Sequence, residues 1–316
     1  MSSASTQGPH ARIETDSPRH RFALRLFDRL WARYRERVSY VADYEKVVAD
    51  AGAQFVNDHI AFRTLACQTP AVGLFALARI FEALDYRPAG CYFFPDKRLT
   101  AMHYAHPHPQ FPKLFLSELH VWELTPGVRE LIYCTAASHR PLVSDELLSQ
   151  LTGLEEDDPS EATLLDTVVD TFHTLPWRPP TPAVVEAVNA ESQYAAWVLA
   201  HGYNVNHFTA LINSHQVASL DSIEKTIAAL QAAGVPMKSE IEGKPGSKLR
   251  QTATAAVEID VPLEGGDLPW SYAYFELAER NDWTDPETGE TARFEGFLGP
   301  QATQLFEMTR RPESGK

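Results

Sequence analysis

Two segments of the chain each carry a histidine in nearly the same setting. Residues 57–64 read NDHIAFRT and contain His59, and residues 204–211 read NVNHFTAL and contain His207. Later in the chain, Glu276 lies in the aromatic run SYAYFEL, where a carboxylate is unusual. Two imidazoles and one carboxylate on one side of a metal are typical of mononuclear Fe(II) oxygenases, because positions stay open for substrate and oxygen. We therefore take His59, His207 and Glu276 as candidate iron ligands.

Each of these three residues also has an ordinary structural interpretation. A single histidine in a strand is more often a hydrogen-bonded core residue than a metal ligand. Glu276 could point to solvent, with Glu279 and Arg280 continuing the same polar face. The functional interpretation rests on the matching places of the two histidines in two similar halves of the chain.

Arg63 is the candidate substrate-binding residue. It follows His59 by four positions, so strand alternation places both side chains on one face. A guanidinium there could bind a substrate carboxylate through two parallel hydrogen bonds. The alternative is a structural ion pair with an interior acid such as Glu118, and the pattern alone favours neither.

A second histidine cluster gives a weaker signal. His103, His106 and His108 form an H-x-x-H-x-H pattern, but Pro107 and Pro109 interrupt it and indicate a loop. We interpret these histidines as structural. The sequence has no dinucleotide fingerprint, phosphate-loop motif or nucleophile elbow, which argues against those classes of enzyme.

The elements that must position these residues repeat along the chain. In both halves, periodicity predicts a strand, an amphipathic helix and then three strands. In the first half the predicted ranges are 55–65, 70–84, 89–94, 99–105 and 113–123. In the second half the strand of His207 is followed by 219–233, 237–242, 253–261 and 270–279. Glu118 and Glu276 end these series at similar distances from their histidines, which predicts that the two carboxylates correspond.

The predicted organisation is one catalytic domain of class α+β over residues 19–308. Residues 1–18 are rich in Ser, Pro and Gly and are predicted to be disordered, and residues 309–316 form a tail. Module one covers about 52–124, a helical insertion about 125–200, and module two 201–308. Further helices are predicted over residues 22–51, before module one.

Composition limits the function classes. The 316 residues are 44% hydrophobic and 22% charged, and the formal net charge is −14. This acidity argues against nucleic acid or an anionic membrane as partner, because both require clustered Lys and Arg. No apolar run reaches the length of a membrane span, the first residues lack the apolar core of a secretory signal, and three scattered cysteines suit a reducing compartment. We therefore expect a cytoplasmic protein; its oligomeric state cannot be predicted.

Several motifs together resemble those of the 2-oxoadipate dioxygenase/decarboxylase family, also called hydroxyglutarate synthases. They are DHIAFRT at 58–64, YFFP at 92–95, FLSEL at 115–119, NHFT at 206–209 and FELAER at 275–280. The resemblance implies a fold similar to the vicinal-oxygen-chelate superfamily, in which two βαβββ modules form an open barrel. It also implies Fe(II) at His59, His207 and Glu276, with Arg63 engaging the substrate.

The reaction implied by the resemblance converts 2-oxoadipate and O₂ into 2-hydroxyglutarate and CO₂, a step of lysine catabolism. Small-molecule 2-oxo dicarboxylic acids and O₂ are thus the expected partners. Two alternatives stay open: a non-redox metal-dependent lyase or isomerase, and a non-catalytic protein that binds a small acid on the same scaffold.

Overall fold

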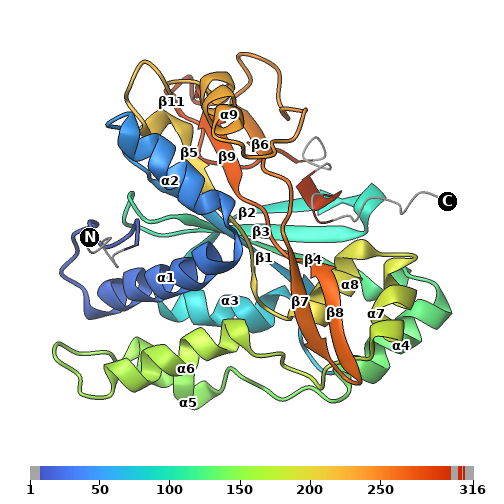
Figure 1. Ribbon diagram of the computed structural model, residues 1–316. Helices are drawn as coiled ribbons and strands as arrows, with labels where there is room; N and C mark the ends of the chain where they lie inside the picture. Colours follow the sequence, from blue (N-terminus) through green and yellow to red (C-terminus); the bar gives the residue numbers. More distant parts are fainter. Residues whose placement is uncertain (1–7, 300–304, 308, 310–316) are drawn as a thin grey trace, which may run out of the picture.

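The computed structural model describes residues 8–299, 305–307 and 309, which form an α+β fold around one large sheet (Figure 1). The rest of the predicted N-terminal segment and tail lies outside the described residues. The helices are α1 (Pro18–Arg37), α2 (Tyr40–Asp50), α3 (Leu74–Ala83), α4 (Pro126–Ala136), α5 (Asp145–Thr152), α6 (Glu161–His173), α7 (Pro182–Asn189), α8 (Gln193–His201) and α9 (Ile223–Ala232). The strands are β1 (Asn57–Leu65), β2 (Arg87–Phe94), β3 (Leu99–Ala105), β4 (Lys113–Leu119), β5 (Val205–Leu211), β6 (Leu249–Ala253), β7 (Glu258–Leu263), β8 (Gly266–Ser271), β9 (Glu276–Arg280), β10 (Asp282–Thr284) and β11 (Thr291–Arg293).

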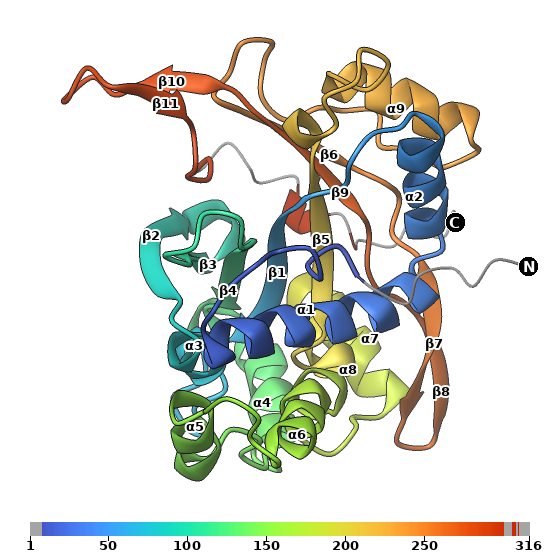
Figure 2. The same cartoon turned by 90° about the vertical axis from the view of Figure 1, so that its left-hand side faces the viewer.

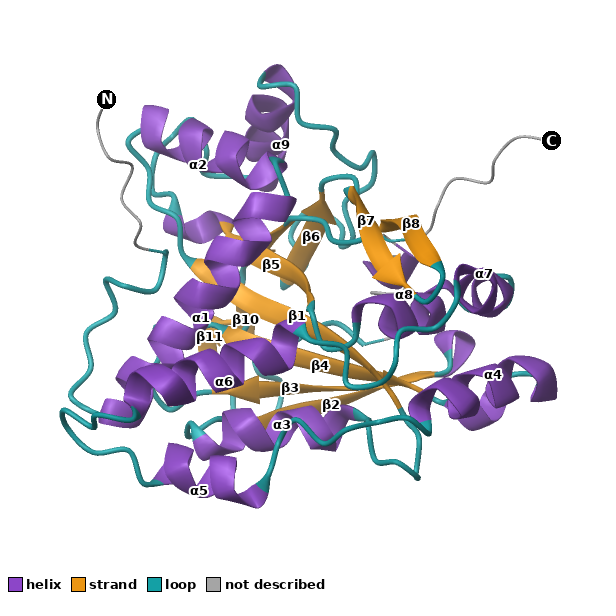
Figure 3. Ribbon diagram, turned by 60° about the horizontal axis from the view of Figure 1, so that its bottom comes forward, coloured by secondary structure: helices purple, strands orange, loops and turns teal. Residues whose placement is uncertain are grey.

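The main sheet joins the two predicted modules edge to edge. Its seven strands run in the order β2-β3-β4-β1-β5-β9-β6 and curl into a half-barrel (Figure 3). The first module is β1-α3-β2-β3-β4, with β1 parallel to β4. The second contributes β5, α9, β6 and β9, with β5 parallel to β9. The predicted fold class, α+β with two modules in an open curled sheet, is confirmed.

The second module differs from the predicted pattern. The strand predicted at 237–242 is reduced to two isolated bridges, at Met237 and Glu242. Strands β7 and β8 leave the sheet and pair only with each other. Each carries a proline, Pro262 and Pro269, which cannot donate to a ladder and is therefore confined to edge strands. Both strands of a two-stranded hairpin are edge strands, so the hairpin can contain both prolines.

The central strand pair relates the two histidines by a local two-fold axis. Strands β1 and β5 are antiparallel, and Ile60 faces Phe208 across the ladder. His59 lies opposite Thr209, and Ala61 lies opposite His207. An axis between Ile60 and Phe208 therefore exchanges the two histidine positions. The similar settings of the histidines in the sequence arise from this symmetry.

The same register corrects the expected correspondence between Glu118 and Glu276. Glu276 pairs with Thr209 on β5, and the symmetry-related position on β4 is that of Phe115, which pairs with Ala61. Glu118 lies three residues further along β4, where its Oε2 accepts a hydrogen bond from the backbone N–H of Leu74. The number of residues between histidine and carboxylate was a poor guide to equivalent positions, because the connections within the two modules differ in length.

Helices α1 and α3 cover the outer face of the sheet, and α6 packs against α1 (Figure 2). Strand alternation sends Ile60, Phe62 and Phe208 into the core with these helices, and Trp31 of α1 packs against Phe208 at 5.0 Å between ring centroids. The alternate residues of β1 then face the opposite, concave side. The predicted helices ahead of module one are thus a cover for the strands that carry the histidines.

The helical segment between the modules also supports the concave side. Helix α8 is buried along its length and contacts β1. Its Tyr194 hydroxyl lies 2.8 Å from Ser117 Oγ on β4, and its Trp197 indole donates a hydrogen bond to the Tyr272 carbonyl. Ser192 caps the helix by accepting a hydrogen bond from the Ala195 N–H. The insertion therefore contributes to the core of both modules.

The described part of the N-terminal segment differs from the prediction of disorder. His10 is 1% exposed, and its Nδ1 lies 2.7 Å from Asp28 Oδ1 on α1. Its Nε2 lies 3.0 Å from Asn57 Oδ1 at the start of β1. A polar composition favours disorder only where no fixed partner exists, and here α1 and β1 provide two. Within the described residues, no helix has the length and apolar character needed to cross a bilayer.

Acid sensitivity is expected from His201 at the end of α8. Burial lowers its pKa from 6.5 to about 4, with its Nε2 2.9 Å from the Ser271 carbonyl. The unfolded chain therefore takes up this proton first, and stability is complete above pH 6.5 and falls as the pH approaches 4. Relative to His201→Gln, the wild type should lose up to about 1.4 kcal/mol more unfolding free energy per pH unit in this window. Urea unfolding at several pH values measures the difference; parallel curves would contradict it.

Candidate metal centre

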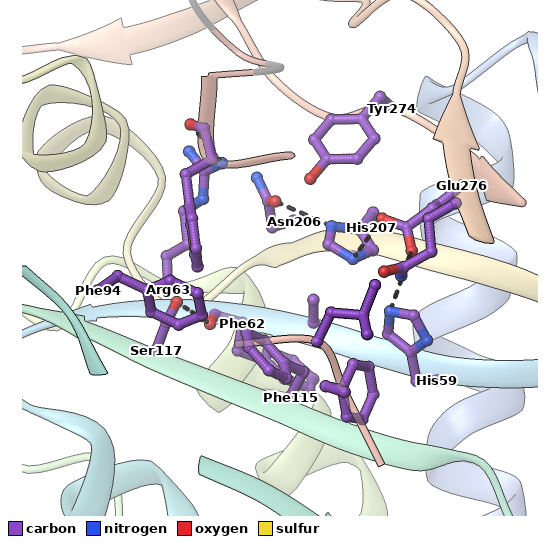
Figure 4. A pocket seen from close by; sticks show the side chains of 15 residues that line it. His59, Phe62, Arg63, Phe94, Phe115, Ser117, Asn206, His207, Tyr274 and Glu276 are labelled. Carbon is purple, nitrogen blue, oxygen red and sulfur yellow. Dashed lines mark hydrogen bonds and ion pairs between the residues drawn. The ribbon is translucent and has the colours of Figure 1, made fainter. Parts of the chain in front are cut away.

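The three candidate ligands converge on the concave side of the sheet. His59 on β1, His207 on β5 and Glu276 at the start of β9 face one another in Figure 4. Glu276 Oε1 lies 3.4 Å from His59 Nε2, and Glu276 Oε2 lies 3.3 Å from His207 Nε2. One ligand atom from each residue lies within 4.8 Å of the other two. Over the described ranges, no other group of three His, Cys, Asp or Glu residues comes together in this way.

The protonation preferences of these residues suit a cation. Glu276 is fully buried, and burial raises the pKa of its carboxyl well above the usual range. Gln251 Nε2 donates to its Oε1 at 2.6 Å, whereas its Oε2 has no hydrogen-bond partner. Burial lowers the pKa of both His59 and His207, which keeps the imidazoles neutral. An unsatisfied buried carboxylate oxygen beside two neutral nitrogens is costly unless a cation binds, so the donor set fits a divalent metal.

A β-bulge precedes each histidine. On β1, Asn57 and His59 pair with neighbouring residues of β5, so Asp58 between them is an extra residue. On β5, Val205 and His207 pair with neighbouring residues of β1, so Asn206 between them is the extra residue. In a regular strand, neighbouring side chains point to opposite faces, and a bulge re-aims one of them. Asp58 Oδ2 thus lies 2.8 Å from His59 Nδ1, and Asn206 Oδ1 lies 3.1 Å from His207 Nδ1. Both acceptors favour protonated Nδ1, which places the lone pair of each ring on Nε2, the nitrogen that faces Glu276. In His59 this Nε2 also lies 3.0 Å from Thr209 Oγ1, a hydroxyl that a bound metal would displace.

Arg280 connects the His59 side of the site to the segment after β11. Its guanidinium donates to Asp58 through Nε at 2.6 Å and Nη2 at 2.8 Å. Burial alone would raise the pKa of Asp58, but the Arg280 charge holds it well below the usual range. The remaining Nη1 donates to the carbonyls of Phe294 and Gly296. The next residue, Phe297, packs against His59, with the two ring centroids 4.8 Å apart.

A pocket extends from the three ligands across the concave face toward β4 and the end of the described chain. Aromatic side chains form much of its wall, with the three ligands at one end, Arg63 at the other, and Asn206 and Tyr274 between them (Figure 4). The apolar lining comes from Ala61, Phe94, Phe115, Phe297, Leu298 and Phe306, and the polar lining beyond the ligands from Arg63, Ser117, Asn206, Gln251 and Tyr274. Such a pocket suits a small molecule with polar ends.

Arg63 lines this pocket and is 2% exposed, as expected for the face of His59. Its Nη1 donates to Thr309 Oγ1 at 2.8 Å, and its Nη2 donates to the Phe306 carbonyl at 3.2 Å. The guanidinium also lies over the Tyr194 ring, 5.0 Å from the centroid. The alternative of an ion pair with Glu118 is not observed. A cation held by neutral groups in a buried pocket can still bind an anion.

The histidines of the H-x-x-H-x-H pattern do not form a site. His103 Nδ1 bonds to the Tyr92 hydroxyl at 2.9 Å, and His106 stacks on Phe111 with centroids 4.0 Å apart. Burial lowers the pKa of both imidazoles to about 4. His103 and His106 thus have the ring and hydrogen-bond contacts that a structural interpretation predicts.

Sequence reasoning missed the residues that hold the ligands. Asp58 and Asn206 had one available signal, a polar residue directly before each histidine in both repeated segments. Arg280 had been considered only as part of a solvated face, although it is 1% exposed. Gln251 gave no local signal, because it reaches Glu276 only through the pairing of β6 with β9.

A curled sheet of two paired modules, with candidate metal ligands between them, is a fold of the glyoxalase, or vicinal-oxygen-chelate, type. A glyoxalase-superfamily protein from Ralstonia eutropha JMP134 has this fold, with a TM-score of 0.73 at 23% identity over 95% of this chain and 90% of that one. The sequence profile of the 2-oxoadipate dioxygenase/decarboxylase family matches residues 26–291. The chain belongs to this enzyme family.

Two relatives illustrate the membership. The chain is 29% identical over 280 residues to the chloroplastic 2-oxoadipate dioxygenase/decarboxylase of Arabidopsis thaliana, covering 81% of this chain and 68% of that protein. The structure of the Oryza sativa hydroxyglutarate synthase in complex with 2-oxoadipate aligns with a TM-score of 0.75 at 22% identity, over 97% of this chain and 98% of that chain. The second comparison concerns the fold alone.

Proposed function

We propose that this protein is an Fe(II)-dependent dioxygenase/decarboxylase that converts 2-oxoadipate and O₂ into 2-hydroxyglutarate and CO₂. The reaction is balanced, because both oxygen atoms of O₂ enter 2-hydroxyglutarate, one in the carboxylate formed from the keto carbon and one in the new hydroxyl group, while CO₂ leaves from the original carboxylate. Lysine breakdown in the cytoplasm is the proposed setting. Family membership supports the reaction, and the observation that carries it is the convergence of His59, His207 and Glu276 in a buried pocket that also contains Arg63.

Each residue has a distinct part in this proposal. His59, His207 and Glu276 would hold the ion from one side and leave the pocket side open to substrate. A ferrous ion supplies chelation of the 2-oxo acid and the electrons that activate O₂. Arg63 would pair with a substrate carboxylate, and the surrounding phenylalanines would exclude water. Asp58 and Asn206 would keep the Nδ1 protons of the two histidines in place.

Oxygen uptake tests this proposal directly. Protein loaded anaerobically with Fe(II) should consume one O₂ and release one CO₂ and one 2-hydroxyglutarate for each 2-oxoadipate. Zn(II)-loaded protein is the control and should consume no oxygen. Metal-dependent turnover without oxygen uptake would indicate the lyase or isomerase alternative, and binding without turnover would indicate an acid-binding protein.

Arg63→Ala is expected to raise the KM for 2-oxoadipate by about 100-fold, because the charge-assisted hydrogen bonds it would form are worth roughly 1.5–3 kcal/mol. The metal content should stay unchanged, since Arg63 is not among the three converging ligands. Arg63→Lys keeps the charge but loses the paired geometry, so an intermediate KM is expected. Steady-state kinetics of the three proteins at equal iron loading provide the measurement. An unchanged KM in Arg63→Ala would exclude Arg63 from substrate binding.

A further inference from the structure

The amide of Asn206 has one paired end and one unpaired end. Its Oδ1 lies 3.1 Å from His207 Nδ1, whereas its Nδ2 has no hydrogen-bond partner. The side chain is 1% exposed and lines the pocket beside the candidate ligands. A buried donor without an acceptor costs roughly 1–3 kcal/mol, which a protein tolerates most readily where function requires it. This donor therefore differs from an ordinary core amide.

The orientation of the amide follows from the role of His207. If Nε2 of His207 binds a metal, its ring proton is on Nδ1 and requires an acceptor. The amide oxygen of Asn206 must then face His207, and the amide cannot turn over. Its Nδ2 is consequently held toward the pocket, on the side where Arg63 and the Tyr274 hydroxyl also lie (Figure 4).

The symmetry-related residue has no such free group. Asp58 occupies the equivalent bulge of β1, but both of its oxygens accept hydrogen bonds from Arg280, and one of them also faces His59 Nδ1. The described hydrogen bonds of Asp58 are therefore all to His59 and Arg280, and none is directed into the pocket. At the Asn206 position, the amide provides an acceptor for the histidine and, in addition, a donor aimed into the cavity.

We propose that Asn206 is a substrate-binding residue whose Nδ2 donates a hydrogen bond to an oxygen of the bound 2-oxo acid while its Oδ1 positions His207. Asn206 lies on β5 beside Ala61 and Phe62 of β1, between the levels of His59 and Arg63. Its donor therefore acts on the stretch of substrate between the metal and the arginine. The inference rests on the proposed function and deepens it.

Asn206→Asp separates the two roles of the side chain. The aspartate keeps an oxygen acceptor for His207 Nδ1 but replaces the donor with a negatively charged acceptor. We expect metal content to match the wild type and metal affinity to be at least as high, while the dissociation constant for 2-oxoadipate rises by about 30-fold or more. Asn206→Leu removes both groups and should weaken metal binding as well, by about 10–100-fold. Calorimetric titration of Zn(II)-loaded proteins with 2-oxoadipate measures affinity without turnover.

Asn189→Asp is the matched control. It makes the same change of amide to carboxylate at the end of α7, outside the residues that line the pocket, so 2-oxoadipate affinity should change little. Equal 2-oxoadipate affinity in wild type and Asn206→Asp would overturn the inference. Parallel losses of metal and substrate in Asn206→Asp would also overturn it, because they would show that Asn206 acts only through His207. Failure of the wild type itself to bind 2-oxoadipate would instead refute the proposed function.

Discussion

Replacing Glu276 by glutamine is expected to abolish metal binding and to lower activity by at least about 1,000-fold, yet to leave the protein folded. The neutral amide cannot balance the charge of a divalent ion, and the ligand set is reduced to two histidines. Burial already raises the pKa of this carboxyl, so a neutral group of the same shape suits the metal-free fold. We therefore expect the metal-free variant to be at least as stable as the wild type.

Elemental analysis, turnover and urea unfolding of metal-free protein together test this prediction. Glu118→Gln is the matched control, because the sequence pattern indicated Glu118 as the counterpart of Glu276. A glutamine there can still accept the hydrogen bond from the Leu74 N–H, and metal content should not change. Full metal occupancy in Glu276→Gln would remove this residue from the ligand set.

Replacing Arg280 by methionine should produce the largest loss of stability, about 3–5 kcal/mol, because it leaves the buried Asp58 carboxylate without its counter-ion. The Phe294 and Gly296 carbonyls also lose their donor. Metal affinity should fall in the same variant, since Asp58 would no longer be held against His59 Nδ1. Urea unfolding and a competitive metal-chelator titration measure the two effects separately.

A double variant distinguishes these effects. Arg280→Met combined with Asp58→Asn removes both charges, so we expect it to recover most of the lost stability. Metal affinity should stay low, because an amide orients His59 less strongly than a carboxylate locked by a guanidinium. If the single Arg280 variant unfolds at the wild-type urea concentration, the buried pair has no structural importance.

The parts of the site that depend on local pattern were predictable. His59 and His207 were recognised because a two-fold axis places them in equivalent strands, and equivalent strands have similar sequences. Arg63 was placed on the correct face because alternation within one strand requires only its own residues. These inferences did not depend on which strands pair or in what register.

The parts that depend on pairing could not be predicted. Glu276 was a candidate ligand from its aromatic setting, but only the strand registers show that its counterpart on β4 is Phe115 and not Glu118. Both bulges are properties of two strands together, so neither Asp58 nor Asn206 could be assigned a role. The role of Arg280 could not be predicted either, because its partner Asp58 lies 222 residues earlier in the chain.

The two bulges give the two imidazoles different partners at otherwise equivalent positions. Asp58 places a full negative charge behind the first imidazole, while Asn206 offers the second only a neutral dipole. The first ring is therefore the stronger electron donor, although the backbone treats both alike. In this chain, exchange of one carboxylate oxygen for an amide nitrogen is enough to give the paired rings different chemical characters.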